Sequence, residues 1–201
     1  GEHLSNVGGA ENLFSLHRAL YTVEEDVFTS ITGDSADSGT PTHSPGRVLR
    51  FFSGRSVRFL FLDLPLDYLP MLIQHEAFGH GYRLSEAGFQ NVSYSLHLPP
   101  PYGDGHGFTL GTDPRRAVSR DQSIAISAAG TEANDVFART LRGKWIASGS
   151  MNHHEARLYL FNAFNRSFYA TRTRFGVMQA GSANDIGNYL RLVNLRHGGE
   201  T

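Results

Sequence analysis

HEAFGH, at residues 75–80, is the most informative segment of this chain. Two imidazoles flank a glutamate, an arrangement with which a single helix can hold a metal ion and activate water. Histidines four residues apart lie about 40° apart around an α-helix, so both can point at one ion. His75 and His80 are five residues apart, which puts them about 140° apart on a regular helix. A shared metal therefore requires a wider turn between them.

A one-residue π-bulge would supply this wider turn, and such bulges concentrate at functional sites. Gly79 has no Cβ and a permissive backbone, and it lies where the extra residue must be absorbed. Pro70 suits the first turn of a helix, and Gly88 suits the position just after a helix. We therefore expect a motif helix at residues 70–87, with a widened turn that contains Gly79.

Two segments resemble zinc enzymes of known families. The pattern H-E-x-x-G-H, formed by His75, Glu76, Gly79 and His80, resembles the zinc motif of the dipeptidyl-peptidase III family, in which the longer spacing is normal. TEANDVF, at residues 131–137, is similar to the glutamate helix of thermolysin-like gluzincins. Together the two resemblances imply a zincin-like metallopeptidase of gluzincin type.

In thermolysin-like enzymes this glutamate is the third zinc ligand, and a following aspartate orients a ligand histidine. The resemblance implies these roles for Glu132 and Asp135. The two residues are three apart rather than four. This departure affects the orienting role implied for Asp135 more than the ligand role implied for Glu132. Small and apolar neighbours at residues 125–133 indicate that the helix packs closely against another element. A carboxylate buried there would need a compensating charge, which zinc would supply.

Composition limits the possible function classes. The 201 residues are expected to form one metallopeptidase-like domain, residues 1–201. Lys and Arg total 18 against 19 Asp and Glu, so charge gives no reason to expect nucleic acid or an anionic membrane as a partner. Cysteine is absent, which leaves histidine and carboxylate as the strong ligands for zinc.

The most apolar segment, residues 59–73, is interrupted by two aspartates and two prolines. It falls short of the roughly 20 apolar residues that a bilayer requires. We expect a soluble protein with no transmembrane segment in this chain, and a secreted or periplasmic location is compatible with the sequence. The compartment, the oligomeric state and whether the chain is a fragment of a longer protein stay open.

The remaining sequence predicts helices and one β-hairpin. Residues 91–98 alternate in polarity and residues 106–111 can pair back across a proline-glycine turn. Ser119 and Gln122 form a candidate capping box. The expected fold is α+β and mainly helical, with a zincin-like core of motif helix, small β-sheet or hairpin, and glutamate helix. A helix is expected at residues 10–31, with an apolar stripe of Leu13, Leu16, Leu20, Val23 and Val27. Further helices are expected at residues 119–142, 153–169 and 183–194. A mobile loop is expected at residues 32–47.

Asp185 is the main rival to Glu132 as third ligand. An aspartate near the start of a helix commonly acts as a cap. Site-2-type membrane metalloproteases, however, use an aspartate as third ligand, and SAAGTEAN at residues 127–134 is similar to their small-residue helix. That resemblance implies a soluble portion or relative of such a membrane enzyme. The sequence leaves the choice between Glu132 and Asp185 open.

The expected function is zinc-dependent hydrolysis, with a peptide or protein as the substrate implied by resemblance. Zn²⁺ held by His75, His80 and Glu132 would keep one position for water, and Glu76 would transfer the water proton. The oxyanion would be stabilised by His153, His154 or Tyr159, which the sequence does not distinguish. The alternative is a metal-stabilised binding protein without catalysis, for which a closed site with both Glu132 and Asp185 on the ion would argue.

Overall fold

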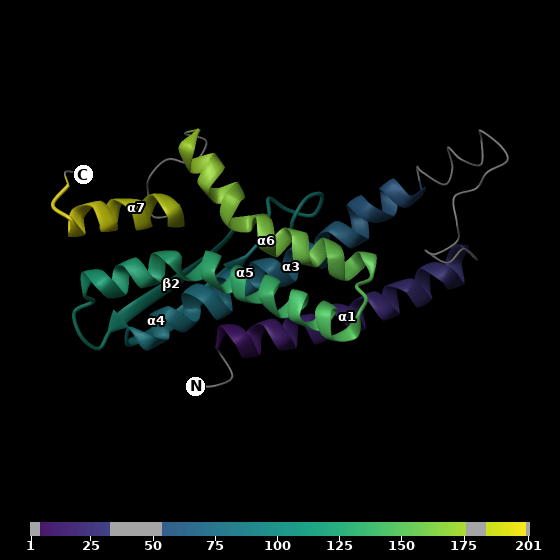
Figure 1. Cartoon of the computed structure of the whole chain (residues 1–201), viewed down its shortest axis with the longest axis horizontal. Coiled ribbons are helices and arrows are strands. Elements are labelled where there is room, and N and C mark those ends of the chain that lie inside the picture. The colour runs from purple at the N-terminus through teal and green to yellow at the C-terminus, as the bar shows by residue number, and fades with distance from the viewer. Residues whose placement is uncertain (1–4, 33–53, 176–183, 200–201) are drawn as a thin grey trace.

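The computed structural model describes residues 5–32, 54–175 and 184–199. These residues are mainly helical with one small antiparallel sheet, as the sequence predicts (Figure 1). Apart from Thr32, the loop expected at residues 32–47 lies outside the described residues. The elements are α1 (Asn6–Thr32), η2 (Phe59–Asp63), α3 (Leu64–Ile73), η3 (Gln74–Gly81), α4 (Tyr82–Glu86), β1 (Phe89–Leu96), β2 (Gly107–Pro114), α5 (Arg120–Ser148), α6 (His153–Arg174) and α7 (Asp185–Arg196), where η denotes a π-helix.

The motif lies in a longer helical run than the sequence predicts. The segments η2, α3, η3 and α4 follow one another without a break. Pro65 lies in the first turn of α3, whereas Pro70 lies inside that helix. The expectation that Pro70 begins the motif helix is therefore wrong, because the apolar residues before it already form helical turns. At the other end Ala87 terminates the run, and Gly88 turns the chain into β1 with a φ of 95°.

The hairpin covers one side of the motif helix. Strands β1 and β2 pair antiparallel, from Phe89 opposite Pro114 to Leu96 opposite Gly107. This confirms the predicted hairpin, although β1 begins two residues earlier than expected. Thr109 on β2 donates its hydroxyl to the Glu76 carbonyl oxygen at 3.1 Å. The hairpin is thus fixed beside the motif glutamate.

Helix α5 packs against η3, α6, α7 and α1, and is the central helix of the described fold (Figure 1). Its N-terminus has the predicted capping box of Ser119 and Gln122, and it ends at Gly149, which has a left-handed φ of 74°. It crosses η3 closely, because a Cβ on Gly79 would lie 2.8 Å from Ala129 O. None of the described helices is both long and apolar enough to cross a membrane.

The hydrophobic core lies between α1, α5 and α6. Its buried members are Ala10, Leu13, Phe14, Phe137, Leu141 and Leu158. The apolar stripe expected on α1 is only partly correct, since Leu13 is buried while Leu16, Leu20, Val23 and Val27 are exposed. The buried face of α1 continues instead through His17 and Tyr21, because both side chains enter a network of ionic contacts with α3 and α6. Polar residues therefore define this face, which hydrophobic periodicity cannot detect.

Candidate metal centre

The wide turn of η3 brings the two motif histidines together. The rings of His75 and His80 lie 5.1 Å apart between centroids. The π-helical geometry of residues 74–81, with Gly79 inside it, confirms the predicted widening. Both rings are buried, with exposed fractions of 2% for His75 and 8% for His80. The extra residue of the motif is thus absorbed without separating the imidazoles.

Asp185, the first residue of α7, supplies the third donor. Its Oδ2 lies 2.8 Å from His75 Nε2 and 3.1 Å from His80 Nε2. Asn184 caps the same helix by accepting a hydrogen bond from the Gly187 amide. The role of N-terminal cap, which was the alternative reading for Asp185, therefore belongs to the residue before it.

The electrostatics of this cluster favour an ionised carboxylate. Burial raises the pKa of Asp185, but the hydrogen bonds from His75 and His80 and the charge of His80 outweigh it and hold that pKa well below its usual range. Burial lowers the pKa of His80, while Asp185 raises it above its ordinary value. Two imidazole nitrogens and one carboxylate oxygen within 4.8 Å of one another match the ligand types of a three-residue zinc site.

The structure does not bring Glu132 to this cluster. Its side chain is 55% exposed, and its carboxylate lies 3.8 Å from Arg83. The expectation that Glu132 is the third ligand is therefore wrong in this structure. The reason is helical phase: Gly130 packs against the His75 ring, and a residue two positions later lies about 200° around the helix. The small residues near Glu132 do pack closely, since Ala129, Gly130 and Ala133 are buried, but Glu132 itself points out of that contact.

Asp135 does not orient a ligand histidine either. Its carboxylate forms an ion pair with Arg166 of α6. Asn134 takes the position expected for Asp135: it is 1% exposed, and its Nδ2 lies 3.2 Å from His75 Nδ1. The sequence analysis missed Asn134, although its four-residue spacing from Gly130 places both on one face of α5.

Glu76 is buried between the motif helix and the hairpin. Its Oε2 accepts a hydrogen bond from the Thr109 hydroxyl at 2.7 Å. A Cβ on Gly107 would lie 3.1 Å from Glu76 Oε1. The carboxylate therefore has a fixed position next to the histidine that precedes it, without joining the cluster around Asp185.

Tyr169 of α6 lies at the centre, whereas the three residues expected there do not. Its ring stacks on His75 with a centroid distance of 5.6 Å and an interplanar angle of 18°. Burial raises the pKa of Tyr169, as do the charges of Asp185 and Glu76, so the phenol stays protonated at neutral pH and can donate. Tyr159 instead packs against the hydrophobic core. The two tyrosines are ten positions apart, which is about 15 Å along a helix, and no local motif shows which end of α6 meets the histidines.

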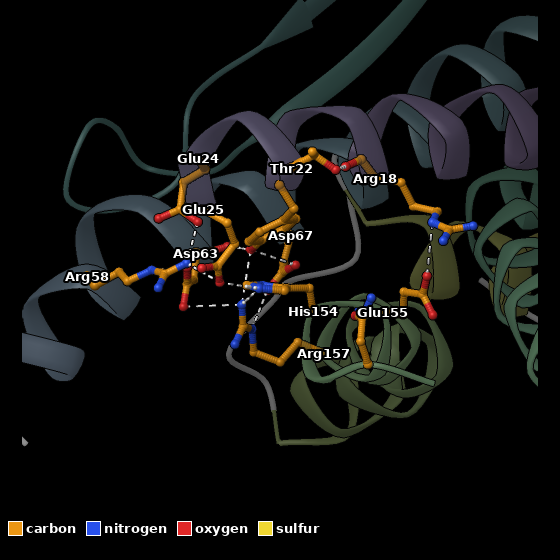
Figure 2. Close-up of polar contacts among 12 residues, drawn as sticks. Arg18, Thr22, Glu24, Glu25, Arg58, Asp63, Asp67, His154, Glu155 and Arg157 are labelled. Carbon is orange, nitrogen blue, oxygen red and sulfur yellow. Dashed lines mark hydrogen bonds and ion pairs between the residues drawn. The ribbon is translucent and has the colours of Figure 1, made fainter. Parts of the chain in front are cut away.

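His153 and His154 belong to a second group, with Glu25 of α1. Glu25 and His154 also belong to what we call the α1–α6 ion network (Figure 2), whose members are Glu24, Glu25, Arg58, Asp63, Asp67, His154 and Arg157. His154 Nε2 lies 3.2 Å from Glu25, and Arg157 donates to His154 Nδ1 at 2.7 Å. Burial lowers the pKa of His154 to about 4, and the charges of His153 and Arg157 lower it further. The lone pair on His154 Nδ1 therefore accepts a hydrogen bond from the Arg157 guanidinium and is not free to bind a metal.

Comparison of the chain with known protein families, with curated proteins and with solved structures finds no match. The interpretation of the site therefore rests on its residues and their geometry.

Proposed function

We propose that this protein is a zinc-dependent hydrolase with His75, His80 and Asp185 as metal ligands. The observation that carries the proposal is the convergence of both Nε2 atoms on one Asp185 oxygen, beside a buried glutamate in a π-helical turn. The donor set of two imidazoles and one carboxylate fits zinc with a fourth position for water. Bound zinc would supply a water molecule of lowered pKa and would polarise a substrate carbonyl.

Glu76 acts as the general base in this proposal. It is next to a ligand in sequence, but its carboxylate hydrogen-bonds to Thr109 rather than to the histidines. It takes the proton released when water attacks the carbonyl carbon, and it passes that proton to the leaving amine as the carbon–nitrogen bond breaks. Tyr169, protonated and stacked on His75, is the candidate donor to the oxyanion.

The hairpin supports an extended peptide as substrate. His97 N–H donates to His106 O at 2.8 Å, so these two residues form a hydrogen-bonded pair. Because such pairs alternate in antiparallel sheets, Gly107, Thr109 and Gly111 direct their backbone polar groups away from β1. Two of these three residues lie against Glu76. An extended peptide can add to such an edge through main-chain hydrogen bonds.

The choice of Asp185 bears on the two alternatives. An aspartate as third ligand is what the resemblance to site-2-type metalloproteases implies, so a portion or relative of such an enzyme is a second form of the same proposal. A closed site with both Glu132 and Asp185 as ligands would favour a binding protein without catalysis. The exposed position of Glu132 argues against that closed site.

The test is a comparison of zinc content and peptide turnover in Glu76→Gln and in the parent. Because Glu76 is assigned to proton transfer, the variant should keep its zinc and lose turnover by about a hundredfold to ten-thousandfold. Glu86→Gln, an exposed glutamate on α4, is the matched control and should match the parent in both measurements. Turnover by Glu76→Gln at the parental rate would refute the catalytic role. A zinc-loaded parent that cleaves nothing across a broad peptide library would favour the binding protein.

A further inference from the structure

Helix α5 holds the inner nitrogens of both motif histidines, but it does so with different groups. His80 Nδ1 lies 2.8 Å from the backbone carbonyl oxygen of Ile126. His75 Nδ1 faces the side-chain amide of Asn134. A carbonyl can only accept, so Nδ1 of His80 must carry a proton. An amide can donate from one end and accept at the other, so the contact at His75 does not fix the proton in the same way.

The amide of Asn134 is buried with one end unused. The residue is 1% exposed, and among the described residues its Oδ1 has no hydrogen-bond partner. A buried acceptor without a partner costs free energy in the state where it occurs, and a second state that uses it would account for its presence. His75 Nδ1 is a group that could donate to this oxygen when it carries a proton, but in the structure it faces the nitrogen end of the same amide.

The two ends of the amide match the two neutral tautomers of His75. In the structure Nε2 of His75 lies 2.8 Å from the Asp185 carboxylate, which can only accept. Nε2 therefore carries the proton, and Nδ1 has a lone pair that accepts from Asn134 Nδ2–H. A metal ligated by Nε2 needs the lone pair there, so the proton must move to Nδ1. A half-turn of the amide then presents Oδ1 to Nδ1–H, so one hydrogen bond between Asn134 and His75 is kept and its direction is reversed.

We infer that Asn134 is a positioning residue that serves both tautomers of His75. It donates to Nδ1 in the metal-free protein and accepts from Nδ1–H when His75 ligates a metal through Nε2. The second half of this inference rests on the proposed function, whereas the first half concerns the metal-free protein alone. Because the amide is buried, it contacts His75 Nδ1 away from bulk solvent.

The first measurement is zinc affinity in competition with a chelator. Asn134→Leu removes both hydrogen-bonding ends at similar volume and should weaken zinc binding by about tenfold to a hundredfold. Asn134→Asp keeps an acceptor and should bind zinc at least as tightly as the parent. Asn162→Leu is the matched control, since Asn162 is also fully buried with an unpartnered Oδ1 but donates to Leu158 O on α6. It should leave zinc affinity unchanged.

The second measurement is the ¹⁵N spectrum of the imidazoles, which reports where the proton lies. In the metal-free parent His75 should be protonated at Nε2, and zinc should move that proton to Nδ1. Metal-free Asn134→Asp should already carry a proton on Nδ1, because a carboxylate there can only accept. Circular dichroism identifies the variants that fold, and both measurements are made on those variants.

The outcomes separate this inference from the proposed function. Zinc binding by Asn134→Leu at parental affinity would overturn the inference, as would equal losses in the Leu and Asp variants. If the parent binds no zinc, the proposed function fails, and the metal-free spectra still decide the role of Asn134. An Nδ1 without a proton in Asn134→Asp would then show that this residue does not set the tautomer.

Discussion

The candidate metal centre and the α1–α6 ion network are both buried clusters of imidazole and carboxylate, yet they balance their charges differently. In the network every carboxylate lies within ion-pair distance of an arginine, either Arg58 or Arg157. At the centre, the ion-pair partners found for Asp185 among the described residues are the two imidazoles. A cluster with its own guanidinium groups is complete without a metal. A cluster of two imidazoles and a carboxylate has the composition that a cation completes.

The largest expected effect is the loss of zinc from Asp185→Asn. A neutral amide is a poor replacement for an anionic ligand, and two histidines alone are too few for a stable site. Metal analysis after gel filtration should find about one zinc per chain in the parent and none in this variant. Glu25→Gln, in the network, and Glu132→Gln, on the exposed face of α5, should both retain full zinc. Loss of zinc from Glu132→Gln would restore the ligand set predicted from sequence.

Gly130→Ala should disrupt the centre without changing a ligand. A Cβ at this position would overlap the His75 ring, so the imidazole must move away from Asp185. We expect zinc affinity to fall by more than about tenfold, the cost typical of altered support for a ligand. Gly143→Ala, on the same helix with open space around it, should bind zinc as the parent does and gain some helix stability. Unchanged affinity in Gly130→Ala would mean that α5 does not support His75.

Arg157→Met should show the opposite profile, with reduced stability and unaltered zinc binding. Arg157 donates to Asp67, which is fully buried, and removing it leaves that carboxylate without its cation. Breaking such a buried pair costs about 3 kcal/mol of unfolding free energy, which urea titration can measure. Arg166→Met breaks a pair whose arginine is 57% exposed and should cost less than about 1 kcal/mol. Equal losses in the two variants would refute the distinction.

At neutral pH the smallest expected effect is that of His154, whose contribution to stability changes only as the pH falls. Its pKa in the folded protein is about 4, below the value of about 6.5 for an unfolded histidine. Between these values the unfolded chain binds a proton that the folded protein does not. The stability from this group is therefore present above about pH 6.5 and falls as the pH decreases toward 4, by at most about 1.4 kcal/mol per pH unit.

His154→Gln removes this titration. The difference in unfolding free energy between the parent and the variant should therefore change with pH only within that interval. Metal-free protein is required, because protonation of ligand histidines also releases zinc. A difference that is constant from pH 7 to 4 would show that His154 titrates normally.

The widened turn was predictable because its cause is local. The five-residue spacing of His75 and His80 and the glycine between them lie within one short segment, and they fix what the backbone must do. The hairpin and the capping box of α5 were predictable for the same reason. Each depends on residues that are neighbours in sequence.

The carboxylate that meets the two motif histidines was not predictable, because its position depends on distant packing. Asp185 follows His80 by 105 residues, and only the placement of α7 against α5 brings the two together. Glu132 has a suitable local sequence, but the rotation of α5 about its axis decides which residues face the histidines. Hydrophobic periodicity cannot fix that rotation where Gly130 and Asn134, rather than large apolar residues, form the buried face.

The π-helical turn of η3 also determines which insertions and deletions the motif can tolerate. Deleting Phe78 would restore the four-residue histidine spacing that suits a regular helix. The same deletion would rotate every following residue by about 100° and shift it by about 1.5 Å. Helix α4 and the hairpin would turn with it, and Thr109 would leave Glu76. The long spacing is therefore maintained by the elements after the motif as much as by the histidines, and the segment can change length only if the hairpin changes with it.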